Sequence, residues 1–500
     1  MTFSDILNPN PLARFLDKNP RDFTRADIIR YIEETGVQMI NYRYAAGDGR
    51  LKTLNFVISG RNHLEKLLTE GERVDGSSLF KYIDSGASDL YVIPRLKTAF
   101  RNPFSPIPTL DLLCTYYTAS GEPMPAAPDN ILRKAQTEFT QATGMTFEAM
   151  GELEYYVISE RDNLYPASSQ SGYHESGPFA KWENLRTEAM QAIASAGGKI
   201  KYGHSEVGFI READREMIQA EIEFLPVPVE DAADQLLIAK WILNMTGYRH
   251  GVQISFAPKI SVGHAGSGMH IHTRLMKDGR SMMIQDGKLS PSARKMIAGF
   301  LKLAPSLTSF GNTVPTSYLR LVPHQEAPTN ICWGDRNRST LVRVPLGWTQ
   351  AADRMFHDRN PQDTAPVADD IARQTVEFRA PDGSANIHLL LAGLTVAARH
   401  GLVSAESLEM AEKLYVDVNI FSEKHRAVQE KLPKLPASCQ ESAEKLIDQR
   451  AFYEEKDVFP AALISRIAEN LASYSDRNLS ESLYGKDEEI RKLVNEYIYR

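Results

Sequence analysis

The 500-residue sequence contains few cysteines, no marked excess of one charge and no long apolar run. Its three cysteines, Cys114, Cys332 and Cys439, lie far apart and form no CxxC pair, which argues against a disulfide framework and indicates a reducing compartment. The longest apolar stretch, around residues 389–398, is about half of what a membrane span requires. Residues 1–20 lack the apolar core of a signal peptide. We therefore expect a cytoplasmic protein without a membrane partner.

Neither the charge nor the short motifs point to the common nucleic-acid- or nucleotide-binding classes. The formal net charge is −7, so the whole chain is a poor general nucleic-acid binder and we expect no nucleic-acid partner. No GxxxxGK[ST] loop occurs, the segment HAGSGMH at 264–270 is not a GxGxxG fingerprint, and no GxSxG elbow is present. A P-loop, a dinucleotide fingerprint and a hydrolase with a nucleophile elbow are therefore not indicated.

The beginning of the chain predicts a small α+β unit. A helix is expected over 24–36, with Thr24 as its N-cap and Gly36 as its stop. Two strand-like runs, VQMINYRY and LKTLNFVI, flank the turn AAGDGR, and the helical segment NHLEKLLTEG follows. A proline-rich passage at 103–108 ends this unit. We predict three parts, namely an N-terminal extension over 1–23, a small domain over 24–110 and a large domain over 111–500.

The larger part of the chain mixes helices and strands without a regular βαβ alternation. Residues 128–143 and 230–247 have helical periodicity, and the tail from Ser438 onward predicts three helices. Between them lie strands that alternate polar and apolar residues. This pattern favours the α+β class over a doubly wound sheet.

Four of these strands carry charged or imidazole side chains on one face. Side chains on a strand alternate faces with a period of two, so residues two apart lie together. The shared faces hold Glu152 and Glu154; Gln219, Glu221 and Glu223; His270, His272 and Arg274; and Glu377 and Arg379.

For a single strand, the simplest interpretation is a polar face turned to water. Four such strands in one domain indicate more than that, because converging carboxylates would repel one another and lose hydration. Divalent cations relieve this repulsion, since hard cations prefer carboxylate oxygens with an occasional imidazole. Arginines in the same place favour a phosphate partner. Metals, carboxylates and arginines together are the components of phosphoryl transfer.

Beyond these strands, a series of ordered motifs resembles the glutamine synthetase family, class I type. The resemblance runs from about residue 24 to 475. The motifs are VDGSSL (74–79) followed by SDL (88–90), GELEYY (151–156), HSEV (204–207), QAE (219–221), GSGMHIH (266–272), SYLRLVPHQEAP (317–328), RNRS (336–339), VRVP (342–345) and VEFRAPDGSAN (376–386), with LPAS (435–438) and DVFP (457–460) in the C-terminal part.

The resemblance implies a fold and an assembly. It implies a small N-terminal β-grasp-like domain and a larger catalytic domain, in which a funnel of antiparallel strands is flanked by helices. It also implies a homo-oligomer of stacked rings, commonly a dodecamer, in which the N-terminal domain of one subunit completes the active site of its neighbour.

It further implies which residues bind two or three Mg²⁺ or Mn²⁺ ions. Glu154, Glu206 and Glu221 match the ligands of one ion. Glu152, His270 and Glu377 match the ligands of the second ion.

Other positions match substrate contacts. His272 matches the histidine near the phosphates of ATP, the co-substrate. Arg338 and Arg343 match arginines that hold the nucleotide and the transferred phosphoryl group. The positions that match contacts to the amino acid are Arg320, Arg379 and the backbone of Gly266.

The implied activity is that of a glutamate–ammonia ligase of nitrogen metabolism. The γ-carboxylate of glutamate would attack ATP to give an acyl phosphate, which ammonia then converts to glutamine. Asp75 matches the base that deprotonates ammonium, and Ser78, Tyr173 and Glu326 match the rest of the ammonium pocket. Glu326 also matches a mobile-loop residue that shields the intermediate from water.

Some positions depart from the family pattern, which keeps alternatives open. Ala265 stands where an asparagine is usual; the other departures are Ser205, Gly151, Thr375 and Arg95. One alternative is therefore a γ-glutamylamide ligase that uses a polyamine or monoamine. Another is a non-catalytic member of the fold, for which eroded metal ligands would be expected. Tyr415 lies near a position that is adenylylated in some members, and we interpret it as an exposed or packing tyrosine.

Overall fold

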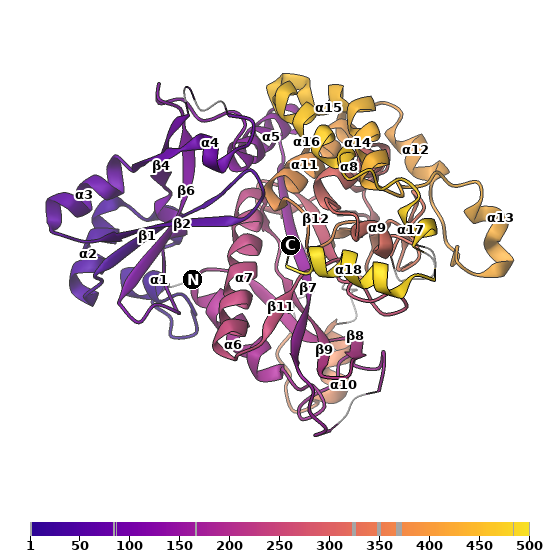
Figure 1. Cartoon of the computed structure of the whole chain (residues 1–500), viewed down its shortest axis with the longest axis horizontal. Coiled ribbons are helices and arrows are strands. Elements are labelled where there is room, and N and C mark those ends of the chain that lie inside the picture. The colour runs from indigo at the N-terminus through magenta and orange to yellow at the C-terminus, as the bar shows by residue number, and fades with distance from the viewer. Residues whose placement is uncertain are drawn as a thin grey trace.

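The computed structural model describes residues 3–83, 86, 88–165, 168–322, 327–347, 352–366, 373–483 and 485–499. The N-terminal domain, at the left of Figure 1, is built on a six-stranded sheet in the order β2-β1-β6-β4-β3, with β5 beside β6. Only the β1–β6 pair in this sheet is parallel. The strands are β1 (Met39–Ala45), β2 (Leu51–Val57), β3 (Glu72–Asp75), β4 (Asp89–Pro94), β5 (Phe100–Arg101) and β6 (Thr109–Tyr117).

The helices of this domain follow local sequence signals. Thr24 caps α2 (Arg25–Thr35) in a capping box with Asp27, and Gly36 ends it at a φ of 68°. The other helices are α1 (Pro11–Leu16), α3 (Arg61–Thr69) and α4 (Gly76–Leu79). Leu12 belongs to the same hydrophobic cluster as Ile28, so the segment before residue 24 packs onto this domain. Strand β6 continues past residue 110, the predicted end of this domain.

The large domain is built on a ten-stranded sheet at the centre of Figure 1. Its main order is β16-β17-β18-β12-β7-β9-β8, and all pairs except β16–β17 are antiparallel. The strands of this domain are β7 (Thr146–Glu160), β8 (Ile200–Arg211), β9 (Arg215–Phe224), β10 (Val227–Pro228), β11 (Gln253–Ser255), β12 (Met269–Lys277), β13 (Arg280–Ser281), β14 (Ile284–Gln285), β15 (Lys288–Leu289), β16 (Trp333–Asp335), β17 (Val342–Val344) and β18 (Val376–Phe378).

Helices pack on this sheet and bury the apolar faces of its strands, which lie opposite the charged faces. Leu153 and Tyr155 of β7 and Ile222 of β9 are fully buried in the main hydrophobic cluster. The helices are α5 (Pro128–Thr143), α6 (Glu183–Ser195), α7 (Val229–Arg249), α8 (Pro291–Gly311), α9 (Ser317–Arg320), α10 (Ala352–Arg359), α11 (Ile387–Val403), α12 (Ser407–Lys413) and α13 (Arg426–Gln429). The two domains together confirm the predicted α+β class, with a small sheet domain and a larger sheet flanked by helices.

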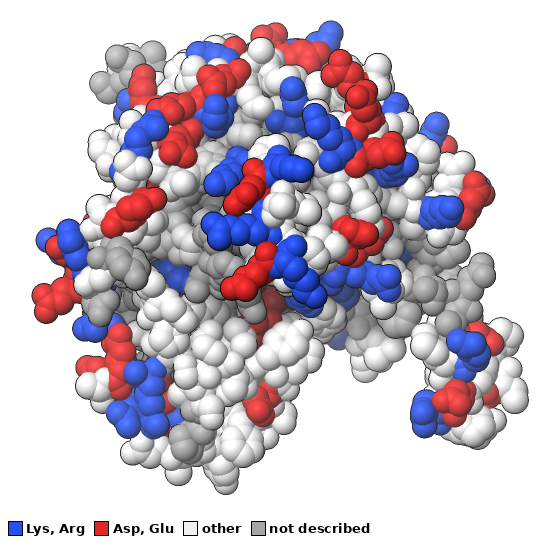
Figure 2. Space-filling model, turned by 90° about the vertical axis from the view of Figure 1, so that its right-hand side faces the viewer, with Lys and Arg blue, Asp and Glu red and all other residues white. Residues whose placement is uncertain are grey.

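The first helices of the C-terminal region pack beside α8 and α11 (Figure 1). It contains the three longer helices that the sequence predicts, α14 (Cys439–Asp448), α16 (Ala461–Ala472) and α18 (Asp487–Tyr497). Two short helices, α15 (Arg450–Glu454) and α17 (Leu479–Ser482), lie between them. Figure 2 shows acidic and basic side chains interspersed over the upper part of the face that it presents.

No single helix in the described parts of the chain is long and apolar enough to cross a membrane. Helices α11 and α12 would reach that length only as a pair, and the chain bends by 107° between them.

Candidate active site

The charged faces of the central strands meet in one wall of a cavity of about 1760 Å³. The strand register places these side chains in cross-strand pairs, because neighbouring antiparallel strands set side chains opposite each other on the same face. The pairs are Glu152 with His270 and with Glu223, Glu154 with Glu221, Glu221 with His204, and Glu377 with His272 and with Arg343.

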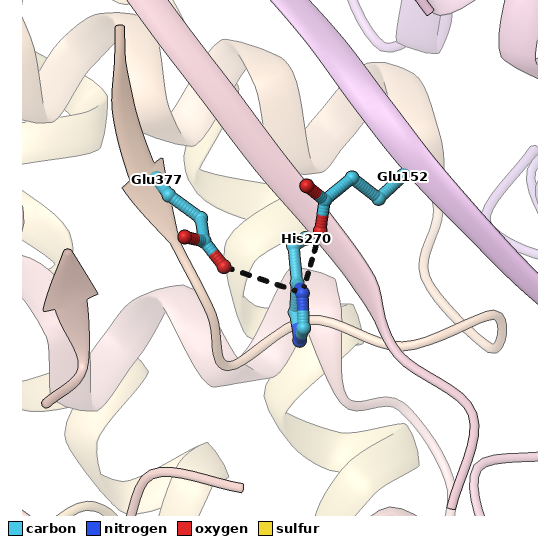
Figure 3. A group of neighbouring side chains, drawn as sticks. All are labelled: Glu152, His270 and Glu377. Atoms are coloured by element: carbon cyan, nitrogen blue, oxygen red, sulfur yellow. Dashed lines mark hydrogen bonds and ion pairs between the residues drawn. The ribbon is translucent and has the colours of Figure 1, made fainter. Parts of the chain in front are cut away.

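The first group with metal-ligand geometry is Glu152, His270 and Glu377 (Figure 3). The Nδ1 atom of His270 lies 2.9 Å from Oε2 of Glu152 and 3.4 Å from Oε1 of Glu377. The three side chains come from β7, β12 and β18 and converge on one point, as Figure 3 shows. These are the residues that the family resemblance assigns to the second ion.

The second group consists of Glu152, Glu223 and His272. The Nε2 atom of His272 lies 2.8 Å from Oε1 of Glu152. Glu223 is 2% exposed, and its Oε1 atom accepts a hydrogen bond from Lys201 at 2.7 Å. The Tyr202 side chain also interacts with the Glu223 carboxylate. The two-residue spacing predicts that Glu223 lies on the charged face of its strand, but no motif indicates a role for it, so Glu223 is a candidate site residue that the sequence did not reveal.

The third group is His204, Glu206 and Glu221. His204 lies 3.7 Å from both carboxylates, through Nδ1 to Glu206 and Nε2 to Glu221. The resemblance places Glu154 with the two glutamates instead. In the structure, Oε2 of Glu154 accepts hydrogen bonds from the backbone of Gly268 at 2.7 Å and from Gln219 at 3.2 Å. Glu154 thus lies beside this group. His204 is a member of the group that the sequence did not indicate as a candidate ligand.

The electrostatics of the cavity fit a bound cation. Burial raises the pKa of Glu221 well above its ordinary value, and the charges of Glu152, Glu154 and Glu206 raise it further. Burial would also raise the pKa of Glu152, but the charges and hydrogen bonds of His272 and His270 outweigh it and hold this pKa well below its ordinary value. Crowded carboxylates with imidazoles are a donor set for hard divalent cations, and the groups here have this composition.

Two arginine guanidinium groups bind the carboxylate of Glu377. Arg343 donates a hydrogen bond to its Oε2 at 2.8 Å, and Arg379 donates to its Oε1 at 3.0 Å. Arg379 also donates to the backbone carbonyl of Arg338. All three arginines line the cavity. The structure therefore brings these three predicted phosphate- and substrate-binding residues next to the metal-ligand groups.

The other two predicted amino-acid contacts, Arg320 and Gly266, also line this cavity. Arg320, 4% exposed, donates to the backbone of Ala380 at 2.8 Å and lies 3.2 Å from Nε2 of His270. A Cβ atom on Gly266 would lie 2.6 Å from the carbonyl oxygen of Pro258 and 3.0 Å from Cγ of Arg320. Only glycine therefore fits between these two segments without rearrangement.

Tyr173 also lines the cavity. Its ring stacks on His174 at 4.2 Å and meets His204 edge-on at 5.6 Å. Tyr173 is 53% exposed, so it lies at an open side of the cavity.

Asp75 and Ser78 lie on the N-terminal domain and do not line this cavity. Asp75 caps α4, and it accepts hydrogen bonds from the Ser78 hydroxyl at 2.6 Å and from the Ser77 hydroxyl at 2.7 Å. Hydrogen bonds from Ser78, Ser77 and Ser88 hold the pKa of Asp75 far below its ordinary value. Asp75 is therefore an exposed, firmly ionised carboxylate. Glu326 lies outside the described residues.

Most of the unusual positions have defined surroundings. The Ser205 hydroxyl receives a hydrogen bond from Arg186 at 3.2 Å, and the Thr375 hydroxyl lies 2.9 Å from Nδ1 of His272. A Cβ atom on Gly151 would lie 2.8 Å from Leu236. The other two departures are Arg95, which forms an ion pair with Asp234, and Ala265, whose carbonyl accepts from Tyr156.

Tyr415 is both exposed and packed. Its side chain is 41% exposed, and its ring meets Trp333 edge-on at 4.9 Å. Its hydroxyl lies 3.4 Å from Oδ2 of Asp335. This agrees with the interpretation of Tyr415 as an exposed or packing tyrosine.

Comparison with known proteins identifies the class to which this fold and site belong. Residues 36–119 match the family model "Glutamine synthetase, beta-Grasp domain", and residues 125–472 match "Glutamine synthetase, catalytic domain". The second match alone spans more than half of the chain. The chain therefore belongs to the glutamine synthetase family, as the ordered motifs predict.

Individual relatives agree over nearly the whole length. The chain is 29% identical over 478 residues to a glutamine synthetase of Frankia alni, covering 88% of this chain and 94% of that protein. It is 28% identical over 493 residues to one of Mycolicibacterium smegmatis, covering 91% and 95%.

Solved structures share the fold at lower identity. Plasmodium falciparum glutamine synthetase matches with a TM-score of 0.73 and 19% identity, covering 92% of this chain and 97% of that one. A structure entitled "Apo GmaS without ligand" matches with a TM-score of 0.69 and 18% identity, covering 90% and 95%.

Proposed function

We propose that the chain is an ATP-dependent carbon–nitrogen ligase that joins ammonia to the γ-carboxylate of glutamate through a γ-glutamyl phosphate, giving glutamine, ADP and phosphate. The observation that carries this proposal is the convergence of three carboxylate–imidazole groups with Arg343, Arg338 and Arg379 in one cavity. A site for acyl phosphorylation needs these two features together, namely ligands for cations and fixed donors for phosphoryl oxygens.

The proposed cofactors are two or three Mg²⁺ or Mn²⁺ ions, held by Glu152, His270 and Glu377 and by Glu206 and Glu221 with Glu154 or His204 beside them. Bound ions would neutralise the charge on the ATP phosphates and on the carboxylate that is phosphorylated. The chain's own residues supply orientation. Glu377 fixes two guanidinium groups at 2.8 and 3.0 Å, which presents Arg343 and Arg379 to phosphoryl or carboxylate oxygens.

The amino acid is proposed to bind between Arg320 and the backbone of Gly266. The buried guanidinium of Arg320 donates to backbone carbonyls and lies at the edge of the first metal-ligand group, which suits it to the carboxylate of a substrate. Gly266 leaves room for a close backbone approach, because a side chain there would clash with Pro258.

The second step is proposed to use a neighbouring subunit. Asp75 and Ser78 are exposed on the N-terminal domain and lie outside the cavity of their own chain, so they would act in the site of an adjacent copy. The strongly lowered pKa of Asp75 keeps it an anion, which would attract and hold ammonium. Ammonium would lose a proton beside this carboxylate, and the ammonia that results would attack the acyl carbon, so that a C–N bond forms and phosphate leaves. We therefore propose a ring oligomer, in which each active site uses residues of two subunits. A dodecamer and a cytoplasmic location stay predictions.

A second candidate is ligation of glutamate to a larger amine. Ala265 lines the cavity with a methyl group where the family resemblance leads us to expect an amide side chain, which leaves that part of the wall without a hydrogen-bonding side chain. All six predicted metal ligands are present in the described cavity wall, which disfavours a non-catalytic role.

Phosphate release from ATP with Mg²⁺ and glutamate tests these alternatives directly, when ammonium is compared with methylamine, ethanolamine, putrescine and spermidine. Turnover that is fastest with ammonium supports the glutamate–ammonia ligase. Turnover only with one of the larger amines would replace it by a γ-glutamylamide ligase. Absence of turnover with every amine, despite ATP binding, would contradict both.

A further inference from the structure

The backbone carbonyls of residues 264–266, called the substrate loop below, each accept a hydrogen bond from a buried side chain. The donors, in chain order of the carbonyls, are Lys259, the Tyr156 hydroxyl at 2.8 Å and Nε2 of Gln219 at 2.9 Å. All three donor residues are at most 1% exposed. The loop belongs to no helix or strand, so these side chains, and not a regular backbone ladder, fix the direction of its carbonyls.

Gln219 also contacts two segments that carry metal-ligand residues. Its Nε2 atom donates to Oε2 of Glu154 at 3.2 Å. Its Oε1 atom accepts a hydrogen bond at 3.1 Å from the backbone N–H of Gly208, in the irregular part of β8 that follows Glu206. One side chain therefore connects the substrate loop to the strands of both glutamates.

Tyr156 and Gln219 meet at the same glycine. A Cβ atom on Gly208 would lie 2.1 Å from the Tyr156 hydroxyl and 2.5 Å from Oε1 of Gln219. Only glycine therefore leaves room for both side chains to reach the substrate loop. In this close packing the two donors have little freedom to turn away from their carbonyls.

We propose that Gln219 and Tyr156 are positioning residues for the amino-acid substrate, which hold the substrate loop in its binding conformation, and that Gln219 also orients the metal ligand Glu154. This inference rests on the proposed function, in which the amino acid binds between Arg320 and the backbone of Gly266. A binding segment that is already ordered gives higher affinity, because less conformational freedom is lost when the ligand binds.

The two residues differ in what they contact, and this difference separates their effects. The Tyr156 hydroxyl binds the substrate loop, whereas the Gln219 amide binds both this loop and Glu154. Loss of the Tyr156 hydroxyl should therefore weaken amino-acid binding alone. Loss of the Gln219 amide should weaken the binding of both the amino acid and the divalent cation.

The experiment measures binding to the full-length protein by isothermal titration. L-Glutamate is titrated in the presence of Mn²⁺ and a non-hydrolysable ATP analogue, and Mn²⁺ and the analogue are each titrated separately. The variants are Tyr156→Phe and Gln219→Met, which remove the polar groups and keep most of the side-chain volume. Tyr155→Phe is the matched control, because Tyr155 is the neighbouring buried tyrosine on β7 and its hydroxyl has no hydrogen-bond partner among the described residues.

We expect glutamate to bind about tenfold more weakly to Tyr156→Phe and to Gln219→Met than to the parent. Mn²⁺ affinity should stay within about twofold of the parent in Tyr156→Phe and fall about fivefold in Gln219→Met. Tyr155→Phe should bind all three ligands as the parent does. In turnover, Tyr156→Phe should raise the KM for glutamate about tenfold and change kcat by less than about threefold.

Two results would overturn the inference alone. The first is glutamate binding to Tyr156→Phe and Gln219→Met that equals binding to the parent. The second is an equal loss of affinity for glutamate, Mn²⁺ and the ATP analogue in Tyr156→Phe, because a merely structural role would weaken all three together. If Gln219→Met does not fold, Tyr156→Phe still tests the role of the substrate loop.

A different result would contradict the proposed function, and this inference with it, namely a parent protein that binds the ATP analogue and Mn²⁺ but not glutamate. The binding measurements need no catalysis. They therefore distinguish a failure of the proposed substrate from a failure of the positioning role, which requires that the parent binds glutamate and that the variants bind it equally well.

Discussion

Glu152 and His272 are in contact through Oε1 and Nε2, which lie 2.8 Å apart. The other oxygen of Glu152 lies 2.9 Å from Nδ1 of His270. One carboxylate therefore belongs to two metal-ligand groups at once, the first completed by Glu377 and the second by Glu223. This shared carboxylate makes Glu152 the central residue of the proposed phosphoryl-transfer site.

Glu223→Gln should weaken divalent-cation binding, because it removes a ligand charge from the second group while keeping the side-chain volume. We expect about tenfold lower Mn²⁺ affinity in the presence of ATP, measured by isothermal titration. Lys201→Ala is the control for loss of the Lys201–Glu223 ion pair. Equal losses in Glu223→Gln and Lys201→Ala would show that the ion pair, and not a ligand atom, accounts for the effect.

Arg95→Met should destabilise the interface between the domains. Arg95 and Asp234 form a paired contact at 2.8 and 2.9 Å, and removal of one partner leaves a poorly hydrated charge on the other. We expect a loss of about 3 kcal/mol, seen as a fall of several degrees in the thermal midpoint. The double variant Arg95→Met/Asp234→Leu should recover much of this loss. A midpoint that is unchanged in Arg95→Met would contradict a stabilising role.

Lys240 provides a test of pH dependence. Its ammonium group is buried and donates to the carbonyl of Gly383 at 2.6 Å, and burial lowers its pKa from 10.5 to about 8. Between these two pKa values the unfolded chain binds more protons than the folded chain, so this group makes stability increase as pH rises. Its destabilising effect is complete below pH 8 and disappears near pH 10.5.

Lys240→Met should remove this pH-dependent change in the free energy of unfolding, which amounts to at most about 3 kcal/mol for the whole pKa shift of Lys240. The measurement is the difference in thermal midpoint between the parent and the variant at several pH values from 7 to 10. Titrating groups that the two proteins share contribute equally to both midpoints, so their effects cancel in this difference. We expect the parent to gain stability relative to Lys240→Met as pH rises. A difference that does not change with pH would show that the Lys240 pKa is near its ordinary value.

Asp75→Asn should impair amide formation more than acyl phosphate formation, because only the second step needs an anion beside ammonium. The measurement compares ammonium-dependent glutamine formation with glutamate-dependent exchange of the phosphate oxygens of ATP. We expect a loss of about a hundredfold in the first and less than tenfold in the second. Equal losses in both would contradict the division of roles.

The sequence predicts the charged wall of the cavity because its signal is local. Glu152 and Glu154 lie two apart on one strand, as do Glu221 and Glu223, and a period of two fixes their common face. The same argument places His270 and His272 together. The helix at 25–35 is predictable for a similar reason, since Thr24 and Gly36 are strong local signals for its start and end.

Other features depend on contacts between distant segments. His204 reaches Glu221 only through the register of β8 with β9, which shifts between Ser205 and Phe209. Arg95 and Asp234 are 139 residues apart in the chain, so no local pattern predicts their pairing. The position of Asp75 outside its own cavity likewise follows from the arrangement of the domains. The order of the motifs predicts the family, but it does not predict which distant residues contact each other.

The most direct test of the phosphoryl-transfer site is ADP formation from ATP, Mg²⁺, glutamate and ammonium by the parent and by Glu152→Gln. Glu160→Gln is the control, since it lies on the same strand but outside the cavity. We predict roughly a thousandfold loss in Glu152→Gln and near-parent turnover in Glu160→Gln, with both variants folded and assembled as the parent is. Near-parent turnover in Glu152→Gln would contradict the account.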